Sequence, residues 1–191
     1  TAKLDKKNGK RGPPGIRLIN KLCPIGKVFN KCIWDKHKRR KKDFAYGYAK
    51  GRRREQAILV QNCIGWRLRR LKVKHVRTMR DVRNAFPSLG QGALGRMLEG
   101  CLDEYSSKMM KMRHEESYMI VRQESGEMLI VKPRSGGLQG DAVMAQEFAE
   151  VYEPVMEQWI EEKEVRGGNV VAVDPVDGEE REVGNTGFAD D

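Results

Sequence analysis

Apolar residues recur at every third or fourth position in four segments of the chain, a spacing that places them on one side of an α-helix. The longest of these patterns has an apolar side that runs from Val143 to Trp159. The patterns predict four helices, over residues 26–34, 55–71, 91–105 and 141–164.

Shorter apolar stretches between these helices predict strands. Residues 16–19 fit a short strand, and residues 73–82 fit a strand that carries Asp81 at its end. Two further pairs of apolar runs are joined by polar, turn-forming residues, which is the pattern of a β-hairpin. These hairpins are predicted over residues 118–131 and 170–188. The order of the elements predicts an α+β fold, with helices packed against an antiparallel sheet.

The first fifteen residues are rich in Lys, Gly and Pro and predict an extended lead-in. The chain has no apolar run of about 18 residues, so we expect no membrane partner. The N-terminus lacks an apolar signal-peptide core, which favours an intracellular protein, nuclear or cytoplasmic. The chain begins without Met and ends at Asp191, so we expect a piece of a longer polypeptide.

The charged residues are distributed unevenly along the chain. Residues 1–80 hold 26 Lys and Arg against 4 Asp and Glu, a balance of +22, and residues 81–191 hold 11 against 23, a balance of −12. A short basic run such as residues 37–42 is usually a solvated face or a localisation signal. A bias sustained over eighty residues favours a groove for a polyanion, and the acidic half could gather carboxylates around metal ions.

The cysteines and histidines do not form a metal-binding pattern. The four cysteines are widely spaced without a C-x-x-C pair, and the three histidines are equally scattered. We therefore expect reduced, partly buried thiols and no zinc site.

Three segments carry the residues that point to chemistry: 81–88, 135–141 and 188–191. In isolation each has an ordinary explanation, since Asp often caps a helix or forms a turn and a terminal Asp pair is usually solvated. In this order and spacing they resemble motifs A, B and C of the reverse transcriptase palm. That family has an Asp followed five residues later by an aromatic residue, a Gln-Gly loop that opens a long helix, and an aromatic-x-Asp-Asp hairpin tip.

Two upstream segments extend the resemblance. Residues 16–19 with 26–29, and residues 47–52 before a helix, are similar to the finger motifs of reverse transcriptases in non-LTR retroelements and group II introns. The resemblance implies the fingers and palm of a right-hand polymerase. The implied domains are an extended lead-in over 1–15, a basic fingers region over 16–72 and a palm over 73–191 that is incomplete at its C-terminus.

The chain departs from the family pattern in three ways. The Ser-Pro that often follows the Gln-Gly loop is replaced near Met144-Ala145, and the motif C aromatic residue is Phe188 rather than Tyr. The chain also stops at the catalytic hairpin, without the return strand or the thumb. We therefore expect the fragment to be inactive by itself, whatever the longer protein does.

The resemblance implies a two-metal site. Nucleotidyl transfer uses two divalent ions, one at the primer 3′-hydroxyl and one at the triphosphate, and Mg²⁺ prefers hard oxygen ligands. The implied ions are two Mg²⁺, with Mn²⁺ as an alternative. Asp81 and Asp190 are the principal predicted catalytic residues and metal ligands. Asp191 is the weaker third, because neighbouring residues of a regular strand point to opposite faces.

The resemblance also implies residues that bind substrate. Phe86 matches an aromatic steric gate that excludes a ribose 2′-hydroxyl, although core packing is an equally ordinary role for it. Gln139 and Gly140 match the loop that lies against the incoming nucleotide and the template. The candidates for gripping the triphosphate are Arg17, Lys50 and Arg52. The candidates for binding nucleic acid are Lys38, Arg39, Arg40, Arg53 and Arg54.

The implied function is RNA-directed DNA polymerisation by a retroelement enzyme, with an RNA template, a DNA primer and deoxynucleoside triphosphates as partners. One alternative is the palm of an RNA-dependent RNA polymerase, but Phe86 stands where such enzymes usually place a polar residue. Another is a non-catalytic nucleic-acid-binding remnant of a retroelement. Host, element class, accompanying endonuclease or RNase H domains, priming specificity and oligomeric state do not follow from the sequence.

Overall fold

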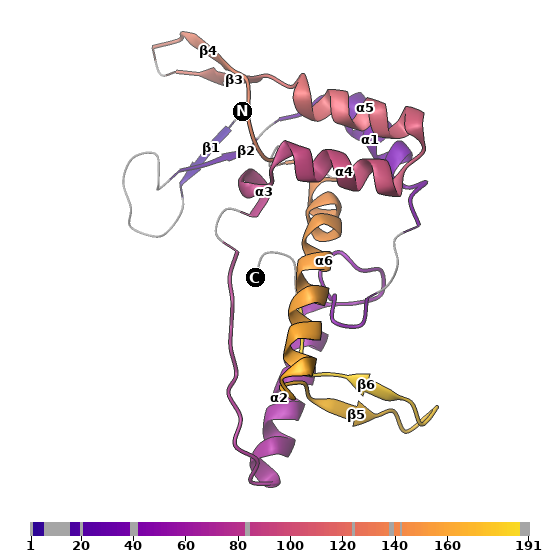
Figure 1. Ribbon diagram of the computed structural model, residues 1–191. Helices are drawn as coiled ribbons and strands as arrows, with labels where there is room; N and C mark the ends of the chain where they lie inside the picture. Colours follow the sequence, from indigo (N-terminus) through magenta and orange to yellow (C-terminus); the bar gives the residue numbers. More distant parts are fainter. Residues whose placement is uncertain are drawn as a thin grey trace. The chain divides into compact units, whose positions relative to one another are not determined.

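The computed structural model of the chain describes residues 2–5, 16–19, 21–38, 42–82, 85–123, 125–137, 140–141 and 143–187 (Figure 1). The chain divides into two compact units. Unit 1 comprises residues 1–38 and 84–148, and unit 2 comprises residues 39–83 and 149–191. Both units draw on the two sides of the predicted fingers–palm boundary, and that boundary stays a prediction.

Unit 1 combines helices with two small antiparallel sheets. Strand β1 (Ala2–Asp5) lies within the predicted lead-in and pairs with β2 (Ile16–Ile19), which confirms the strand predicted at 16–19. Strands β3 (Met119–Arg122) and β4 (Met128–Val131) form the first predicted hairpin. The helices of this unit are α1 (Pro24–Trp34), α3 (Ala85–Ser88), α4 (Gln91–Cys101), α5 (Glu104–Glu115) and the first turn of α6 (Met144–Val165).

The core of unit 1 lies where α4, α5 and the start of α6 meet. Its fully buried apolar side chains include Leu94 and Leu98 from α4, Met110 from α5 and Met144 from α6. Leu94 and Leu98 are four residues apart and therefore lie on one side of α4, which accounts for the amphipathic pattern of this helix.

The single helix predicted over residues 91–105 is wrong in one respect, because the structure has two helices there. Leu102 is extended (φ −121°, ψ 160°) and ends α4. The carboxylate of Asp103 then accepts a hydrogen bond of 2.9 Å from the backbone N–H of Ser106 and caps α5. An Asp that satisfies a free N–H group of a new helix stabilises this break.

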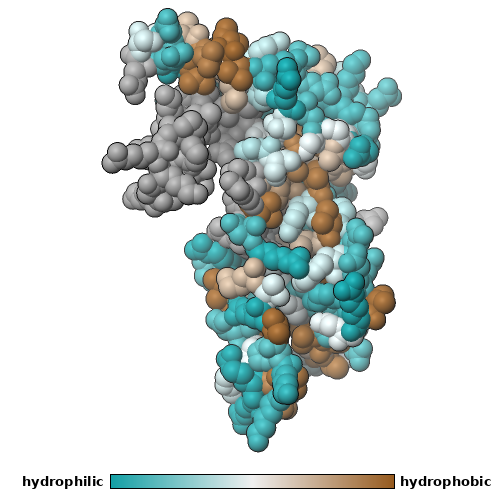
Figure 2. Space-filling view, turned by 60° about the vertical axis from the view of Figure 1, so that its left-hand side comes forward, coloured by the Kyte–Doolittle hydropathy of each residue, from teal (hydrophilic) through white to brown (hydrophobic). Residues whose placement is uncertain are grey.

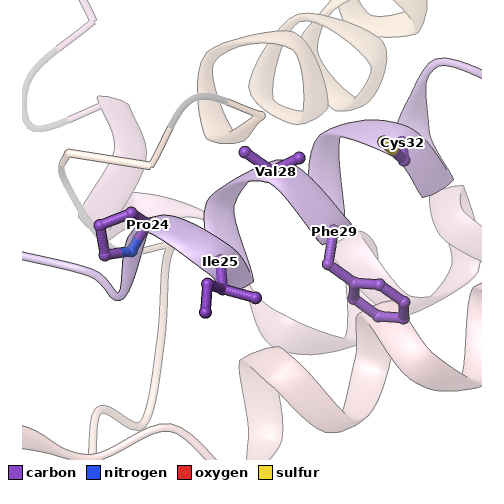
Figure 3. Close-up of a pocket in the computed structure, with 5 residues that line it drawn as sticks. All are labelled: Pro24, Ile25, Val28, Phe29 and Cys32. Carbon is purple, nitrogen blue, oxygen red and sulfur yellow. The ribbon is translucent and has the colours of Figure 1, made fainter.

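Helix α1 buries only part of its apolar surface. Ile33 and Trp34 are buried, whereas Ile25 and Phe29 are 80% and 49% exposed. The exposed residues line a hollow of about 510 Å³ along the helix, and Figure 3 shows their side chains on successive turns. Exposed apolar residues also stand in small groups among hydrophilic ones on the face drawn in Figure 2.

Unit 2 is built around α2 (Arg54–Arg70), the remainder of α6 and the hairpin of β5 (Val171–Val173) with β6 (Glu180–Glu182). The Gln61 side chain of α2 donates to the carbonyl of Gly184 at 3.2 Å. The backbone of Gly187 exchanges hydrogen bonds with the loop at Phe44 and Tyr46, at 2.7 and 2.8 Å. The segment after β6 therefore joins the helix to this loop.

Two predicted strands differ from the structure. Residues 73–82 contain no strand, because their apolar residues Val73, Val76 and Met79 recur every third position and cannot share one face of a strand. The second hairpin is confirmed, but its last strand ends at Glu182 rather than at residue 188, since residues 184 and 187 bond to other segments.

The mixture of helices and antiparallel strands is compatible with the predicted α+β class. The single sheet expected behind the helices is absent from the described residues, which form three separate two-stranded sheets instead. In the same part of the chain, no helix is both long and apolar enough to cross a membrane. All four cysteines are free, and three of them are exposed rather than partly buried as predicted.

The C-terminus of α2 has an unusual residue in its cap. The N–H of Val73 bonds to the carbonyl of Leu68 and the N–H of Lys72 to that of Arg69, both at 3.0 Å, which is the Schellman arrangement. Lys72 has φ +55°, in the left-handed region where Gly is usual and another residue costs about 1–2 kcal/mol.

We predict that Lys72→Gly raises the free energy of unfolding by about 0.5–1 kcal/mol, because the released strain exceeds the added entropy of the unfolded chain. The measurement is urea denaturation followed by circular dichroism. Lys74→Gly, two residues further on, is the matched control and should lower stability by a similar amount. Equal effects of the two variants would contradict a strained Lys72.

Candidate functional site

The last four residues of the segment that resembles motif A form the short helix α3 (Ala85–Ser88) in unit 1. Ala85 is buried, and the Ser88 hydroxyl donates to its carbonyl at 2.8 Å. The ring of Phe86 meets the ring of Phe148 edge to face, with centroids 5.8 Å apart and an interplanar angle of 83°. This geometry is favourable for aromatic pairs and holds the half-buried Phe86 in one orientation.

The glycines that open motif B lie directly against this short helix. The N–H of Gly136 donates to the carbonyl of Leu89 at 2.6 Å, and the N–H of Gly137 donates to that of Phe86 at 3.1 Å. A Cβ on Gly136 would come within 2.5 Å of the Phe86 carbonyl oxygen, and its φ is +74°. Only glycine allows this approach, so the structure brings segments A and B together.

Four charged or titratable side chains are buried behind the motif B loop. Arg113 and His114 come from α5, Asp141 follows the loop, and Glu147 belongs to α6. Arg113 pairs with Asp141 and lies 3.5 Å from Glu147, whose carboxylate also lies 3.2 Å from His114 Nε2. We call these four residues the buried charge cluster.

The buried charge cluster fixes the start of α6. The carboxylate of Asp141 accepts from the N–H of Val143 at 3.1 Å while it faces Arg113. The carboxylates of Asp141 and Glu147 are fully buried, so they need a positive partner. Burial lowers the pKa of the Arg113 guanidinium from its ordinary value, and Glu147 opposes this shift. The chain after Gly140 is thus anchored to α5.

The three predicted metal ligands are placed only in part. Asp81 belongs to unit 2, is exposed, and lies in the strand-free segment 73–82 rather than at a strand end as predicted. Asp190 and Asp191 lie outside the described residues, as does Gln139. Gly140 is exposed with φ +102°. The convergence of the three carboxylates therefore stays a prediction.

Arg52 has a structural role that the sequence did not indicate. Its Nη1 donates to the carbonyls of Lys42, Asp43 and Ala45 at 2.5, 2.8 and 2.7 Å. Its guanidinium also lies over the ring of Tyr46, 5.1 Å from the centroid. Arg52 thereby holds the loop before α2 in shape. A contact with the triphosphate stays a prediction.

Four of the other predicted cationic residues are exposed, and the exposure of the remaining three is not described. Lys38, Lys50, Arg53 and Arg54 are exposed, the last two at the N-terminus of α2. Arg17 lies in β2, and Arg39 and Arg40 fall outside the described residues. The backbone N–H of Arg53 donates to the side-chain oxygen of Gln56 at 2.8 Å.

The sequence analysis missed the buried charge cluster. One signal was present, since Glu147 falls on the apolar side of the predicted helix, four residues after Val143. A carboxylate on a core-facing position needs a buried partner. The identity of that partner depends on the packing of α5 against α6, which the helical pattern does not specify.

Comparisons with known proteins give a distant similarity. No family model and no curated protein matches the chain. A solved structure described as apo telomerase from Candida tropicalis, truncated from its C-terminal domain, is similar with a TM-score of 0.47 and 14% sequence identity. The match covers 78% of this chain and 31% of the telomerase chain, so this chain spans about a third of that structure. Similarity at this level does not establish a shared fold.

We predict that Arg113→Met lowers the free energy of unfolding by about 3–5 kcal/mol, because it leaves buried carboxylates without their cation. Replacing Asp141 by Asn and Glu147 by Gln in the same variant should recover at least about half of the loss. Urea denaturation measures both effects.

The matched control for this series is Arg122→Met, since Arg122 is exposed in β3 and its replacement should change stability by less than about 0.5 kcal/mol. A loss below about 1 kcal/mol for Arg113→Met would show that Asp141 and Glu147 do not depend on it.

Proposed function

We propose that this chain is the fingers and palm portion of a retroelement reverse transcriptase, an RNA-directed DNA polymerase of the non-LTR or group II intron type. The observation that carries the proposal is the contact of Gly136 and Gly137 with the carbonyls of Leu89 and Phe86. These are two of the three segments that resemble the polymerase motifs, and they are far apart in the sequence.

The surroundings of Phe86 support its proposed role as a steric gate. A gate excludes a ribose 2′-hydroxyl only if its ring cannot swing away, and the edge-to-face contact with Phe148 restricts the ring. The backbone of Gly137 bonds to the Phe86 carbonyl, so the loop that leads to Gln139 and Gly140 starts beside this ring. An incoming nucleotide would then lie beside the ring of Phe86 and the chain that follows Gly137.

The buried charge cluster supports the same site from behind. Asp141 directly follows Gly140, and its pairing with Arg113 holds the chain at the far end of the loop. The loop is therefore attached to the protein on both sides of the predicted nucleotide contacts.

The proposed metal ligands are Asp81, Asp190 and Asp191, which would hold two Mg²⁺ ions. Asp81 suits this role as a hard oxygen donor, because its carboxylate is exposed and has no ion-pair partner among the described residues. Bound Mg²⁺ would activate the primer 3′-hydroxyl and stabilise the leaving pyrophosphate. The geometry of the site depends on Asp190 and Asp191.

The basic part of unit 2 supports binding of the template and primer. The guanidinium of Arg52 donates hydrogen bonds to three backbone carbonyls. Around it in sequence, Lys50, Arg53 and Arg54 are exposed near the N-terminus of α2. Exposed cations can bind the phosphates of a nucleic acid. We assign nucleic-acid contacts of the proposed polymerase to Arg53 and Arg54 of unit 2, and the contacts of Lys38, Arg39 and Arg40 stay predictions from the resemblance.

We predict RNA-templated primer extension with Mg²⁺ and deoxynucleotides by a polypeptide in which this chain continues beyond Asp191. Asp190→Ala and Asp81→Ala should each reduce the rate by at least about a hundredfold, since each removes a ligand worth several kcal/mol of transition-state stabilisation. The readout is extension of a labelled DNA primer.

Asp35→Ala is the control, because Asp35 makes only an exposed pair with Lys31 and should leave extension unchanged. Extension that persists in the Asp190→Ala variant would remove this residue from the site. A folded polypeptide that binds RNA but extends no primer, with either Mg²⁺ or Mn²⁺, would contradict the proposed polymerase activity.

We further predict that Phe86→Ala reduces the preference for deoxynucleotides over ribonucleotides by about ten- to a hundredfold, because the ribose hydroxyl no longer meets the ring. The ratio of the two incorporation rates in one sample does not depend on how much of the protein is folded. Phe86→Tyr keeps the bulk and should keep the preference. Unchanged selectivity in Phe86→Ala would exclude the gate.

A further inference from the structure

The C-terminal end of α2 and the segment that follows it carry a dense set of cations. No Asp or Glu occurs between residues 67 and 80, and every cation in this stretch is exposed. We call this set the α2-end cluster. Its members are Arg67, Arg69, Arg70, Lys72, Lys74, Arg77 and Arg80.

The α2-end cluster has no anionic partner in the part of the chain that the structure describes. Its members contact neutral groups instead: Arg70 lies over Trp66 at 5.1 Å and Arg80 over Trp159 at 4.7 Å, and Arg77 donates to the Asn62 side chain at 3.2 Å. The helix dipole favours cations only within the last turn, so it does not account for the residues beyond Arg70.

The members of the α2-end cluster lie on one region of unit 2. The chain turns at Lys72 and returns along the helix, as the hydrogen bond from Arg77 to Asn62 requires. Figure 1 shows residues 71–82 leaving the end of α2 as an extended segment without regular secondary structure, which runs in the direction opposite to the helix. The cations of the helix end and of the returning segment therefore lie in one region, and an external anion would reduce their mutual repulsion.

Lys72 adds an independent observation. It occupies the left-handed position of the helix cap, where Gly would be less strained. A strained residue inside a charged surface is a reason to expect a functional role for its side chain. Here the side chain adds a seventh positive charge at the turn between the helix and the returning segment.

We propose that the α2-end cluster binds the phosphodiester backbone of a nucleic acid, at a site separate from the polymerase groove proposed above. Arg54 lies at the other end of α2, about 24 Å from Arg70 at a rise of 1.5 Å per residue and about 12 Å from Asn62, the contact of Arg77. Five of the seven members are Arg, whose planar guanidinium binds phosphate oxygens in pairs. The contacts are to phosphate, so they carry no base sequence preference.

This site does not depend on the proposed polymerase activity, because it needs neither metal ions nor nucleotides. The test is fluorescence anisotropy of a labelled 20-nucleotide single-stranded RNA with the full chain in EDTA, over a series of salt concentrations. The cluster variant combines Arg67→Gln, Arg69→Gln and Lys74→Gln, which have no described side-chain partner. The matched control combines Arg96→Gln, Lys108→Gln and Arg122→Gln, exposed cations of unit 1.

The cluster variant should bind RNA about a hundredfold more weakly at 0.1 M salt, and the slope of log K against log salt should fall by about 2, at roughly 0.7 for each lost phosphate contact. The control removes the same net charge and should change the slope by less than about 0.5. A second variant, Lys72→Gly with Lys74→Gln, leaves the helix untouched and should lower the slope by about 1.4.

Equal slopes for the cluster variant and the control would overturn the proposal, since binding would then follow net charge alone. Loss of binding to phosphatidylserine vesicles with unchanged RNA binding would overturn it too, and would assign the cluster to an anionic membrane. Adding Arg53→Gln and Arg54→Gln to the cluster variant should lower the slope further. No further fall would show that the two ends of α2 do not act as separate sites.

Discussion

The arrangement of unit 1 depends on the close contact between the backbone of Gly136 and the carbonyls of Leu89 and Phe86. The backbone can come this close only because residue 136 has no side chain, and its positive φ is available to Gly at little cost. The contact fixes where the chain enters the loop before α6, and the pairing of Asp141 with Arg113 fixes where it leaves. The backbone contact therefore places Phe86 beside the start of this loop.

The buried charges of unit 1 and the exposed cations at the end of α2 in unit 2 are arranged differently. In unit 1, the fully buried carboxylates of Asp141 and Glu147 lie beside the guanidinium of Arg113, because an unpaired buried charge would cost several kcal/mol. In unit 2, the cations at the end of α2 stay exposed and contact indole rings and an amide rather than carboxylates. The first arrangement stabilises the fold, and the second leaves charge available for a ligand.

Arginine serves both purposes in this chain, and burial distinguishes them. The side chain of Arg52 is only 15% exposed and donates hydrogen bonds to three carbonyls of one loop. Its charge therefore stabilises this loop. Arg53 and Arg54, next in sequence, are exposed at the N-terminus of α2. Because both are exposed cations, we assign them to the proposed nucleic-acid surface.

The sequence by itself determined the helices α1, α2 and α6 and the two hairpins, since their patterns repeat within a few residues and report local geometry. It also singled out Phe86 and the segment 135–141, and the structure has the backbone of Gly137 bonded to the carbonyl of Phe86. Only the tertiary structure decided the break at Asp103, the lack of a strand at Asp81, the partner of Glu147 and the internal role of Arg52. Each of these features depends either on a group that is distant in the chain or on competition between local helix caps. The spacing of residues along one segment carries no information about either.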